Sequence, residues 1–499
     1  MDTKPSLAQR IKHFFIGHAK SLHDRDIFYN LSLIAFFAWV GLGADALSSS
    51  SYGPEEAFLA LGSHTFLGIF VALASALTIL VISASYSQII ELFPSGGGGY
   101  LVASKLLSPI FGMISGCALI IDYVLTITIS IAAGAAAIFS FLPREWLPYS
   151  LWFAVLGVIL LTILNLRGVK ESITVLIPIF LAFIITHIII VIYGLFTHFS
   201  NFPQLIQSIK IDAHGAYLEI GFLGIFLLVM RAYSFGAGTY TGIEAVSNSL
   251  PILREPRVKT AKRTMTYMSL SLAFMAVSLM LAYLLYQVAP VSGKTLNAVL
   301  FGQVTQGWGT VGYVFLLITL ISEAALLFIA AQAGFIGGPR ILANMALDRW
   351  LPSRFTTLSD RLVIRNGILI MGMSALAMML FTHGSVRFLV VLYAINVFIT
   401  FVLSQLGMVR YWWNSRLRVK NWKSKLLING IGLAMTSFIL LSVIILKFHE
   451  GGWITLLITS GLILVAIFIK RHYNRTKRLT YRLEHLVQKA EAHTEEFIP

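Results

Sequence analysis

The chain has 499 residues, of which 57 % are hydrophobic and 12 % are charged, and its formal net charge at pH 7 is +15. Soluble domains carry about 25 % charged residues, so a chain with half that share is not a soluble enzyme, a nucleic-acid-binding protein or a disordered protein. We therefore expect an integral membrane protein that lies in the lipid bilayer and binds no nucleic acid. The single cysteine, Cys117, excludes an intramolecular disulfide and a metal site built from several thiolates.

Apolar segments long enough to cross a bilayer, about 20 residues each, follow one another from residue 30 to residue 470. Twelve such spans put both termini on one side. Basic residues gather before the first span, at 254–263, at 340–365, at 410–425 and after residue 470, which predicts that this side is cytoplasmic. The sequence thus predicts an all-α protein of the plasma membrane (the inner membrane in a bacterium). The twelve expected spans are 30–60, 64–90, 107–139, 149–165, 172–197, 217–249, 266–288, 309–333, 362–381, 387–411, 426–447 and 452–470.

The segment before the first span, residues 1–29, spaces apolar side chains at helical intervals between basic ones. This pattern is typical of an amphipathic helix on a membrane surface, and it also fits a helix in solvent. We assign residues 30–411 to a transporter core of ten helices and residues 412–470 to two further helices. Residues 471–499 are expected to form a short cytoplasmic tail.

The first and sixth spans each carry glycines just before an acidic residue, Asp45 in one and Glu244 in the other. Glycine permits non-helical backbone, but bare backbone groups in lipid cost several kcal/mol each, so a broken span is stable only where it lines a cavity. Glycines also let helices pack closely, so glycines in one span alone would not distinguish a broken helix from a packed one. Two interrupted spans in corresponding halves indicate the central site of a transporter, and spans 1 and 6 indicate a five-plus-five inverted repeat. The helix-breaking glycines are Gly41 and Gly43 in the first span and Gly236, Gly238 and Gly242 in the sixth.

Acidic side chains outnumber basic ones within the expected spans. A charge at the bilayer centre costs at least about 2.5–3.5 kcal/mol, so it usually marks an ion path or a paired site. We take Asp45, Asp122, Glu244 and Glu323 as the intramembrane acids and Arg231 as the one intramembrane base. This excess predicts a core that holds cations or protons. Asp45, Glu244 and Asp122 are the candidates for proton coupling.

Hydroxyl groups lie along one face of the third span, at Tyr123, Thr126 and Ser130. Oxygen atoms at this spacing suit a weakly hydrated monovalent cation, although such hydroxyls can also bond their own backbone or a neighbouring helix. The chain has no G-x-x-x-x-G-K-[ST] motif, so ATP hydrolysis is excluded and transport would have to use an ion gradient. We expect no catalytic residues and no bound cofactor.

Six runs of residues resemble the KimA-type potassium transporters of the KUP family, which belongs to the amino acid–polyamine–organocation (APC) superfamily. The resemblance covers roughly residues 25 to 470. The runs are 45–56 (DALSSSSYGPEE), 94–100 (PSGGGGY), 121–126 (IDYVLT), 241–248 (TGIEAVSN), 339–352 (PRILANMALDRWLP) and 392–398 (LYAINVF).

This resemblance implies a LeuT-like fold of ten core helices in two inverted repeats, plus two more helices. It implies proton-coupled potassium uptake, with K⁺ held by carboxylates at Asp45 and Glu244. It also implies that a homodimer is to be expected. The coordinating hydroxyls that it implies are those of Tyr52, Tyr123, Ser130, Thr241 and Tyr393.

Two other functions stay open on the sequence. An amino acid or polyamine permease of the same superfamily usually holds the substrate carboxylate at a small break in span 1. Asp45 stands at that break here, so it would repel a carboxylate and attract an organic amine. A cation channel is the third hypothesis, but paired breaks and exchangeable acids favour alternating access over an open pore.

Overall fold

The computed structural model describes residues 33–94, 96, 98–166, 173–357, 359 and 364–495. Within these ranges the regular secondary structure is helical, and the sole β-type pairing is one isolated bridge between Leu33 and Leu253. The expected amphipathic helix in residues 1–29 lies outside the described residues. The chain divides into two compact units, which are described separately below.

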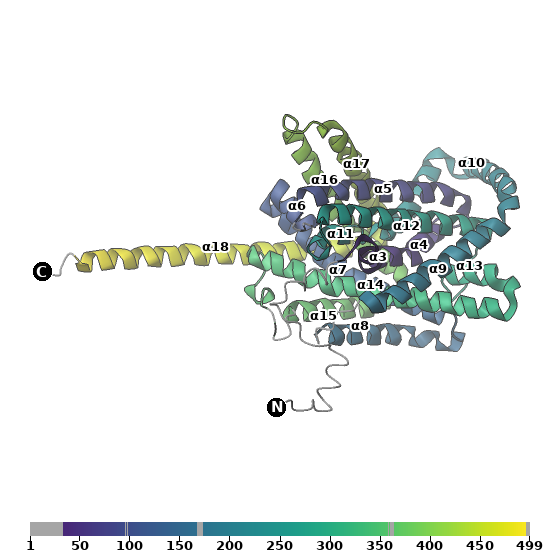
Figure 1. The fold of residues 1–499 in the computed structure, drawn as a ribbon, viewed down its shortest axis with the longest axis horizontal. Coiled ribbons are helices and arrows are strands. Elements are labelled where there is room, and N and C mark those ends of the chain that lie inside the picture. Colours follow the sequence, from purple (N-terminus) through teal and green to yellow (C-terminus); the bar gives the residue numbers. More distant parts are fainter. Residues whose placement is uncertain are drawn as a thin grey trace, which may run out of the picture. The chain divides into compact units, whose positions relative to one another are not determined.

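Unit 1 comprises Met1–Gly98 and Ala133–Ala330. Its helix α12 packs along α5 and also contacts α3 and α9, and Figure 1 shows α5 and α12 running side by side. The helices of unit 1 are α3 (Ala35–Ser48), α4 (Gly53–Ala60), α5 (Gly68–Leu92), α8 (Ser150–Leu166), α9 (Ile173–Thr197), α10 (Phe202–Phe235), α11 (Ala245–Asn248), α12 (Arg257–Leu285) and α13 (Leu296–Thr305).

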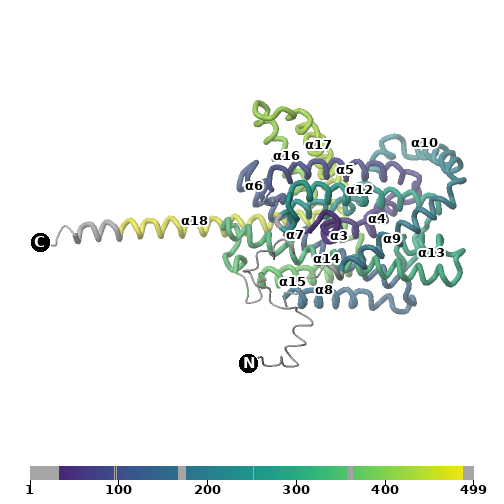
Figure 2. The backbone as a smooth tube through the Cα atoms, in the orientation of Figure 1, coloured from purple at the N-terminus to yellow at the C-terminus, as the bar shows by residue number. Residues whose placement is uncertain are grey.

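Unit 2 comprises Gly99–Ala132 and Ala331–Pro499. Its helix α16 packs against α17 and α6. The part of the last helix, α18, that is drawn in yellow is straight in Figure 2. The helices of unit 2 are α6 (Gly99–Leu106), α15 (Arg365–Phe381), α16 (Val386–Asn414), α17 (Trp422–Lys447) and α18 (Trp453–Glu495), while α7 (Pro109–Phe139) and α14 (Gly309–Leu347) each begin in one unit and end in the other.

Nine stretches of the described chain are long and apolar enough to cross a membrane, and α15 is a shorter apolar helix. This confirms the prediction of an all-helical protein with many spans. A helix also lies at each of the twelve expected positions. Some of the nine stretches, such as Trp422–Leu486, contain two expected spans. The count of twelve crossings and the inverted repeat therefore stay predictions.

Some helical features were not expected from hydropathy. Helix α13 has ten residues, too few to cross a bilayer, and the Thr295 hydroxyl caps it by accepting the Ala298 N–H at 3.2 Å. Helix α10 is interrupted at Gly221, whose φ is +67°. Helix α14 continues to Leu347, well beyond the expected span end at residue 333. A method that searches for apolar length finds the spans but not these short or polar continuations.

Interhelical hydrogen bonds hold the end of α10 and the segment after it against α5. Helices in lipid associate through close packing and such bonds rather than through a hydrophobic driving force. The hydroxyl of the fully buried Tyr240 lies 2.9 Å from the Ser75 hydroxyl. One turn further along α5, Thr78 hydrogen-bonds Tyr233. These bonds fix the broken sixth span in position within unit 1.

Candidate functional site

The first broken span of unit 1 ends its helix at a run of serines. Helix α3 stops at Ser48, a 3₁₀ turn spans Ser49–Ser51, and α4 begins at Gly53. Three consecutive serine hydroxyls, on Ser48, Ser49 and Ser50, donate to carbonyls of the last turn of α3 at 2.8, 2.5 and 2.7 Å. Serine side chains that bond the backbone in this way compete with helix continuation, and Pro54 offers no N–H to the preceding turn.

The prediction that Gly41 and Gly43 break this span is wrong. Both residues lie inside α3, and the break follows five residues after Gly43. Glycine permits a break without forcing one, and a helix interior keeps every backbone group bonded. Gly43 has a packing role, because a β-carbon there would stand 3.0 Å from Cδ1 of Trp39.

The second broken span has its break where the glycines predict it. After α10 ends at Phe235, a 3₁₀ turn covers Gly236–Tyr240, and Thr241 is extended with ψ of 160°. Gly242 then adopts a φ of +76°, a conformation that L-residues with a β-carbon rarely take. Gly236 and Gly238 thus lie in the turn and Gly242 lies at the positive φ, while their role in breaking the span stays a prediction.

The two breaks contact each other within unit 1. The Ser49 hydroxyl also lies 3.1 Å from the Thr239 carbonyl oxygen, which shares the one hydroxyl proton with the nearer Ala46 carbonyl. Two glycines permit the close approach. A β-carbon on Gly53 would stand 2.9 Å from the Thr239 nitrogen, and one on Gly242 would stand 2.7 Å from the Ala46 nitrogen. The predicted site residues of spans 1 and 6 are thereby brought into one region.

Two carboxylates lie at these breaks. Asp45, in the last turn of α3, is half-buried, and Glu244, directly before α11, is 6 % exposed. The two side chains lie near enough to interact electrostatically, and the Tyr86 side chain of α5 is next to Glu244. Two like charges in a buried place repel unless a cation or a proton compensates them. The region can therefore hold positive charge.

The other two predicted groups of unit 1 are buried at the same breaks. Tyr52 follows the turn Ser49–Ser51 and precedes α4. The Thr241 hydroxyl donates to the Gly238 carbonyl at 2.9 Å, which leaves the lone pairs of its oxygen available as ligands.

The remaining predicted residues belong to unit 2. Thr126 on α7 donates to the Tyr393 hydroxyl on α16 at 3.3 Å, so these two predicted groups are brought together. Tyr123 and Ser130 are buried on the same helix, as is Asp122. Tyr123 fits against α14 because Gly337 lacks a side chain: a β-carbon there would stand 2.6 Å from Cε1 of the ring.

Two kinds of residue that contact the predicted site residues were missed by sequence reasoning. Tyr86 lies in a span with no other special feature, and nothing in its local pattern points to Glu244. Gly334 and Gly337 carry a signal that could have been read, since small residues one turn apart in an apolar helix commonly mark close helix packing.

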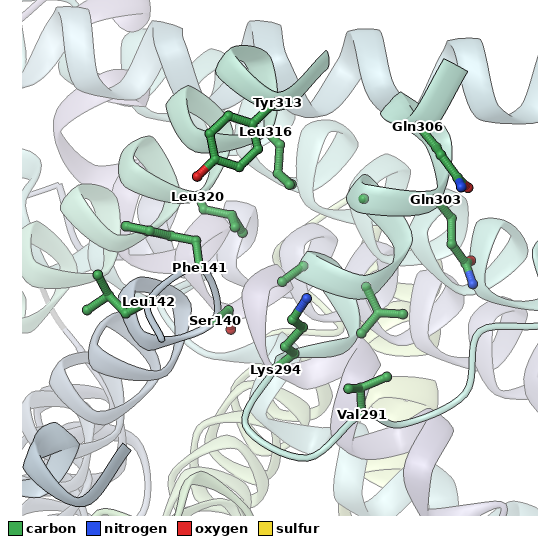
Figure 3. A pocket seen from close by; sticks show the side chains of 13 residues that line it. Ser140, Phe141, Leu142, Val291, Lys294, Gln303, Gln306, Tyr313, Leu316 and Leu320 are labelled. Atoms are coloured by element: carbon green, nitrogen blue, oxygen red, sulfur yellow. The ribbon is translucent and has the colours of Figure 1, made fainter. Parts of the chain in front are cut away.

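A separate cavity of about 360 Å³ lies within unit 1 (Figure 3). It is lined by residues of α13, α14 and two connecting segments, and none of the predicted site residues is among them. Lys294 and Tyr313 lie on opposite sides of it in Figure 3. A lysine in the wall makes this cavity a poor place for a cation. Among the described residues, no three His, Cys, Asp or Glu side chains are grouped so that they could hold a metal ion.

Residues 29–470 match the amino acid permease family. The chain belongs to this family. It is also 33 % identical over 438 residues to "Potassium transporter KimA" of Bacillus subtilis (strain 168), covering 87 % of this chain and 70 % of that protein. The permease described here is therefore a transporter of the APC superfamily and not an enzyme, and it spans a membrane several times.

Among solved structures, the permease is similar to a manganese transporter of Eremococcus coleocola, both in a complex with an aromatic bis-isothiourea compound and as a glutamate-to-glutamine mutant. The TM-score is 0.43 in both cases, at 14 % and 15 % identity. Each match covers 91 % of this chain and 96 % of the other.

Proposed function

We propose that this permease takes up potassium ions together with protons across the plasma membrane. The observation that carries the proposal is the meeting of the two broken spans, with Asp45 on one and Glu244 on the other. Buried carboxylates are stable when a cation or a proton is with them, so the region favours positively charged cargo. The similarity to a protein named as a potassium transporter supports K⁺ as that cargo.

In this proposal K⁺ exchanges its hydration water for oxygen ligands from the protein. Asp45 and Glu244 would supply negative charge, and Tyr52 and Thr241 would supply hydroxyl oxygens. Carbonyl oxygens freed at the two breaks would complete the shell, because such oxygens can replace the hydration of K⁺. The hydroxyls of unit 2 proposed for the same task are those of Tyr123, Thr126, Ser130 and Tyr393.

The proton would bind to one of the acids during the cycle. A carboxylate that holds K⁺ when ionised and a proton when neutral couples the two ions without further chemistry. Asp45, Glu244 and Asp122 are the proposed carriers. We propose that no bound cofactor takes part and that both termini face the cytoplasm.

Ion uptake into liposomes tests the proposal. The purified permease is reconstituted, and ⁸⁶Rb⁺ or K⁺ uptake is measured with and without an inward proton gradient. Asp45→Asn and Glu244→Gln are expected to abolish gradient-stimulated uptake. Asp212→Asn, which alters an exposed acid of α10, serves as the matched control and should transport like the wild type. Absence of K⁺ movement by correctly folded protein would reject the proposal.

An organic cation is the second candidate substrate, because the family is described as amino acid permeases and Asp45 stands beside the first break. A carboxylate there would attract an amine and repel a free carboxylate. Competition separates the candidates. Basic amino acids and polyamines are added in excess during ⁸⁶Rb⁺ uptake, and radiolabelled forms are tested as cargo. Uptake of an amine without ⁸⁶Rb⁺ uptake would favour this candidate.

A further inference from the structure

A second polar cluster lies inside unit 1, apart from the pair Asp45 and Glu244. It joins His187 on α9, Tyr283 on α12, Asn297 on α13 and Glu323 on α14. All four side chains are buried, with His187 at 0 % and Glu323 at 1 % exposure. Buried ionisable groups within membrane spans are costly and usually functional. The proposed transport site gives these residues no role.

The surroundings of His187 define which of its nitrogens carries a proton. Nδ1 lies 2.9 Å from the carbonyl oxygen of Phe183, and a carbonyl can only accept, so Nδ1 is the donor. Nε2 therefore faces Glu323, whose Oε2 lies 3.5 Å away. The rings of Phe183 and Phe301 pack on the imidazole at centroid distances of 3.9 and 5.0 Å. Water has little access to this contact.

These positions require a proton between His187 and Glu323. Without one, a nitrogen lone pair would face an ionised carboxylate in a dry interior. One proton on either partner gives a pair with no net charge. Removing that proton leaves a net charge of −1, and adding a second one leaves +1. Both charged states cost free energy in the membrane interior, so the pair with one proton is the resting form.

Asn297 connects this pair to the first broken span. Its amide nitrogen donates to Oε1 of Glu323 at 3.2 Å and also reaches the carbonyl oxygen of Ser51 at 3.5 Å. Its amide oxygen accepts the Tyr283 hydroxyl at 2.5 Å, which fixes the orientation of the amide. Ser51 belongs to the turn between α3 and α4. A change in the charge of Glu323 would thus alter a bond that ends at this break.

Other ionisable groups face the cluster from α4 and α12. Glu55 accepts the Leu296 N–H at the start of α13 and interacts electrostatically with Glu56 and Glu323. Tyr283 interacts with Glu55 and Glu323 as well. Carboxylates of α4 thus lie near Glu323, and like charges there repel each other.

We propose that His187 and Glu323 form a second proton-binding site, whose occupancy is transmitted through Asn297 to the break at Ser51. The proton site stands independently of the proposed cargo, whereas its effect on transport rests on the proposed function. When the pair releases its proton, Glu323 is left ionised beside a neutral imidazole and its bond to the Asn297 amide strengthens, and when the proton returns this bond weakens. The contact of that amide with Ser51 then changes with the state of the pair.

Magnetic resonance of ¹⁵N-histidine-labelled protein in liposomes tests the site without any transport assay. The chain has 12 histidines, and the His187 resonance is identified by its loss in His187→Gln. We expect this resonance to respond to pH in the wild type and in Ser322→Ala, the matched control on α14 whose hydroxyl bonds the Thr319 carbonyl. In Glu323→Gln the response should be lost or displaced. Glu323→Asp, which keeps a carboxyl group, should retain a pH-dependent signal.

A His187 resonance that does not respond to pH in the wild type would overturn the proposal, and so would one with the same response in Glu323→Gln. The wild-type measurement decides even if a variant fails to fold. Uptake assays then test the connection to the break: Glu323→Gln and Asn297→Ala should change the pH profile of ⁸⁶Rb⁺ uptake, and Ser322→Ala should not. Unchanged profiles would reject the connection through Asn297. If the wild type moves no ⁸⁶Rb⁺, the proposed function fails, while the resonance experiment still decides the proton site.

Discussion

Gly242 lies against the backbone of Ala46, so closely that a β-carbon on the glycine would stand 2.7 Å from the Ala46 nitrogen. The two residues come from different broken spans, and each is near an acid, Glu244 or Asp45. Two properties of glycine permit this approach. The φ of +76° suits a residue without a β-carbon, and the space beside Gly242 is filled by backbone atoms, which cannot change rotamer to make room. A backbone contact therefore limits how far apart the two broken spans can lie beside their acids.

Gly242→Ala should separate the two breaks. The positive φ alone costs about 1–3 kcal/mol, and the contact with Ala46 adds to it. We expect a lower thermal unfolding midpoint in detergent and loss of most ⁸⁶Rb⁺ uptake. Gly461→Ala on α18 is the control, since no atom lies within 4 Å of its added β-carbon. Wild-type stability in Gly242→Ala would show that the breaks are not held by this contact.

Tyr86→Phe tests whether the α5 tyrosine supports Glu244. Loss of one buried hydrogen-bonding partner of an ionisable group costs about 1–3 kcal/mol, and ~1.4 kcal/mol corresponds to tenfold in an equilibrium constant. We expect the K⁺ concentration for half-maximal uptake to rise roughly tenfold, while the protein stays folded. The exposed Tyr217 of α10 provides the control variant Tyr217→Phe. Equal half-maximal concentrations in the two variants would remove Tyr86 from the site.

Gly337→Ala tests the placement of Tyr123. The new β-carbon would stand 2.6 Å from Cε1 of the tyrosine ring, so the ring must move. Because the obstacle is the end of a side chain, we expect little loss of thermal stability and a several-fold rise in the K⁺ concentration for half-maximal uptake. Gly430→Ala on α17 meets no atom within 4 Å and should behave like the wild type. If both variants bind K⁺ as the wild type does, Tyr123 does not contribute a ligand.

Hydropathy predicted where the helices lie, because a crossing requires a minimum apolar length and little else. The sixth-span break was also predictable, since the sequence concentrates glycine there and the positive φ at Gly242 is one that other residues rarely adopt. The break in the first span was misplaced. Its glycines lie inside a regular helix. The serines at the end of α3 act through hydrogen bonds from their hydroxyls to backbone carbonyls, and a hydropathy pattern contains no information about such bonds.

The contacts between distant segments could not be predicted. Tyr86 and Glu244 are each ordinary in their own helices, and their meeting depends on how α5 packs beside the sixth span. The same holds for His187, which lies in an apolar segment of α9. Its contact with Glu323 exists because α9 and α14 present these two side chains to each other. Tertiary packing determines which side chains of distant helices meet, and a single sequence carries no signal for these contacts.

Tyr100 connects α6 to the segment after α14 and gives a prediction about pH. Its hydroxyl donates to the Asp348 carboxylate, while Lys470 of α18 donates to the Asp348 carbonyl at 2.6 Å. Burial, and then the bond to Asp348, raise the pKa of Tyr100 above its usual value of about 10. A raised folded-state pKa means that the stabilisation is complete below about pH 10 and is lost only as pH rises through the higher folded value.

Tyr100→Phe should therefore lower the thermal unfolding midpoint by the same amount at pH 7 and pH 9. The hydrogen bond is worth about 1 kcal/mol, because Asp348 is exposed while Tyr100 is buried. Tryptophan fluorescence of the detergent-solubilised permease reports the midpoint, and Tyr481→Phe, at an exposed position of α18, is the control. A penalty that disappears between pH 7 and pH 9 would mean that Tyr100 ionises in that range, contrary to its buried contact with a carboxylate. An equal penalty at both values would establish the bond as a permanent link between α6 and the end of α14.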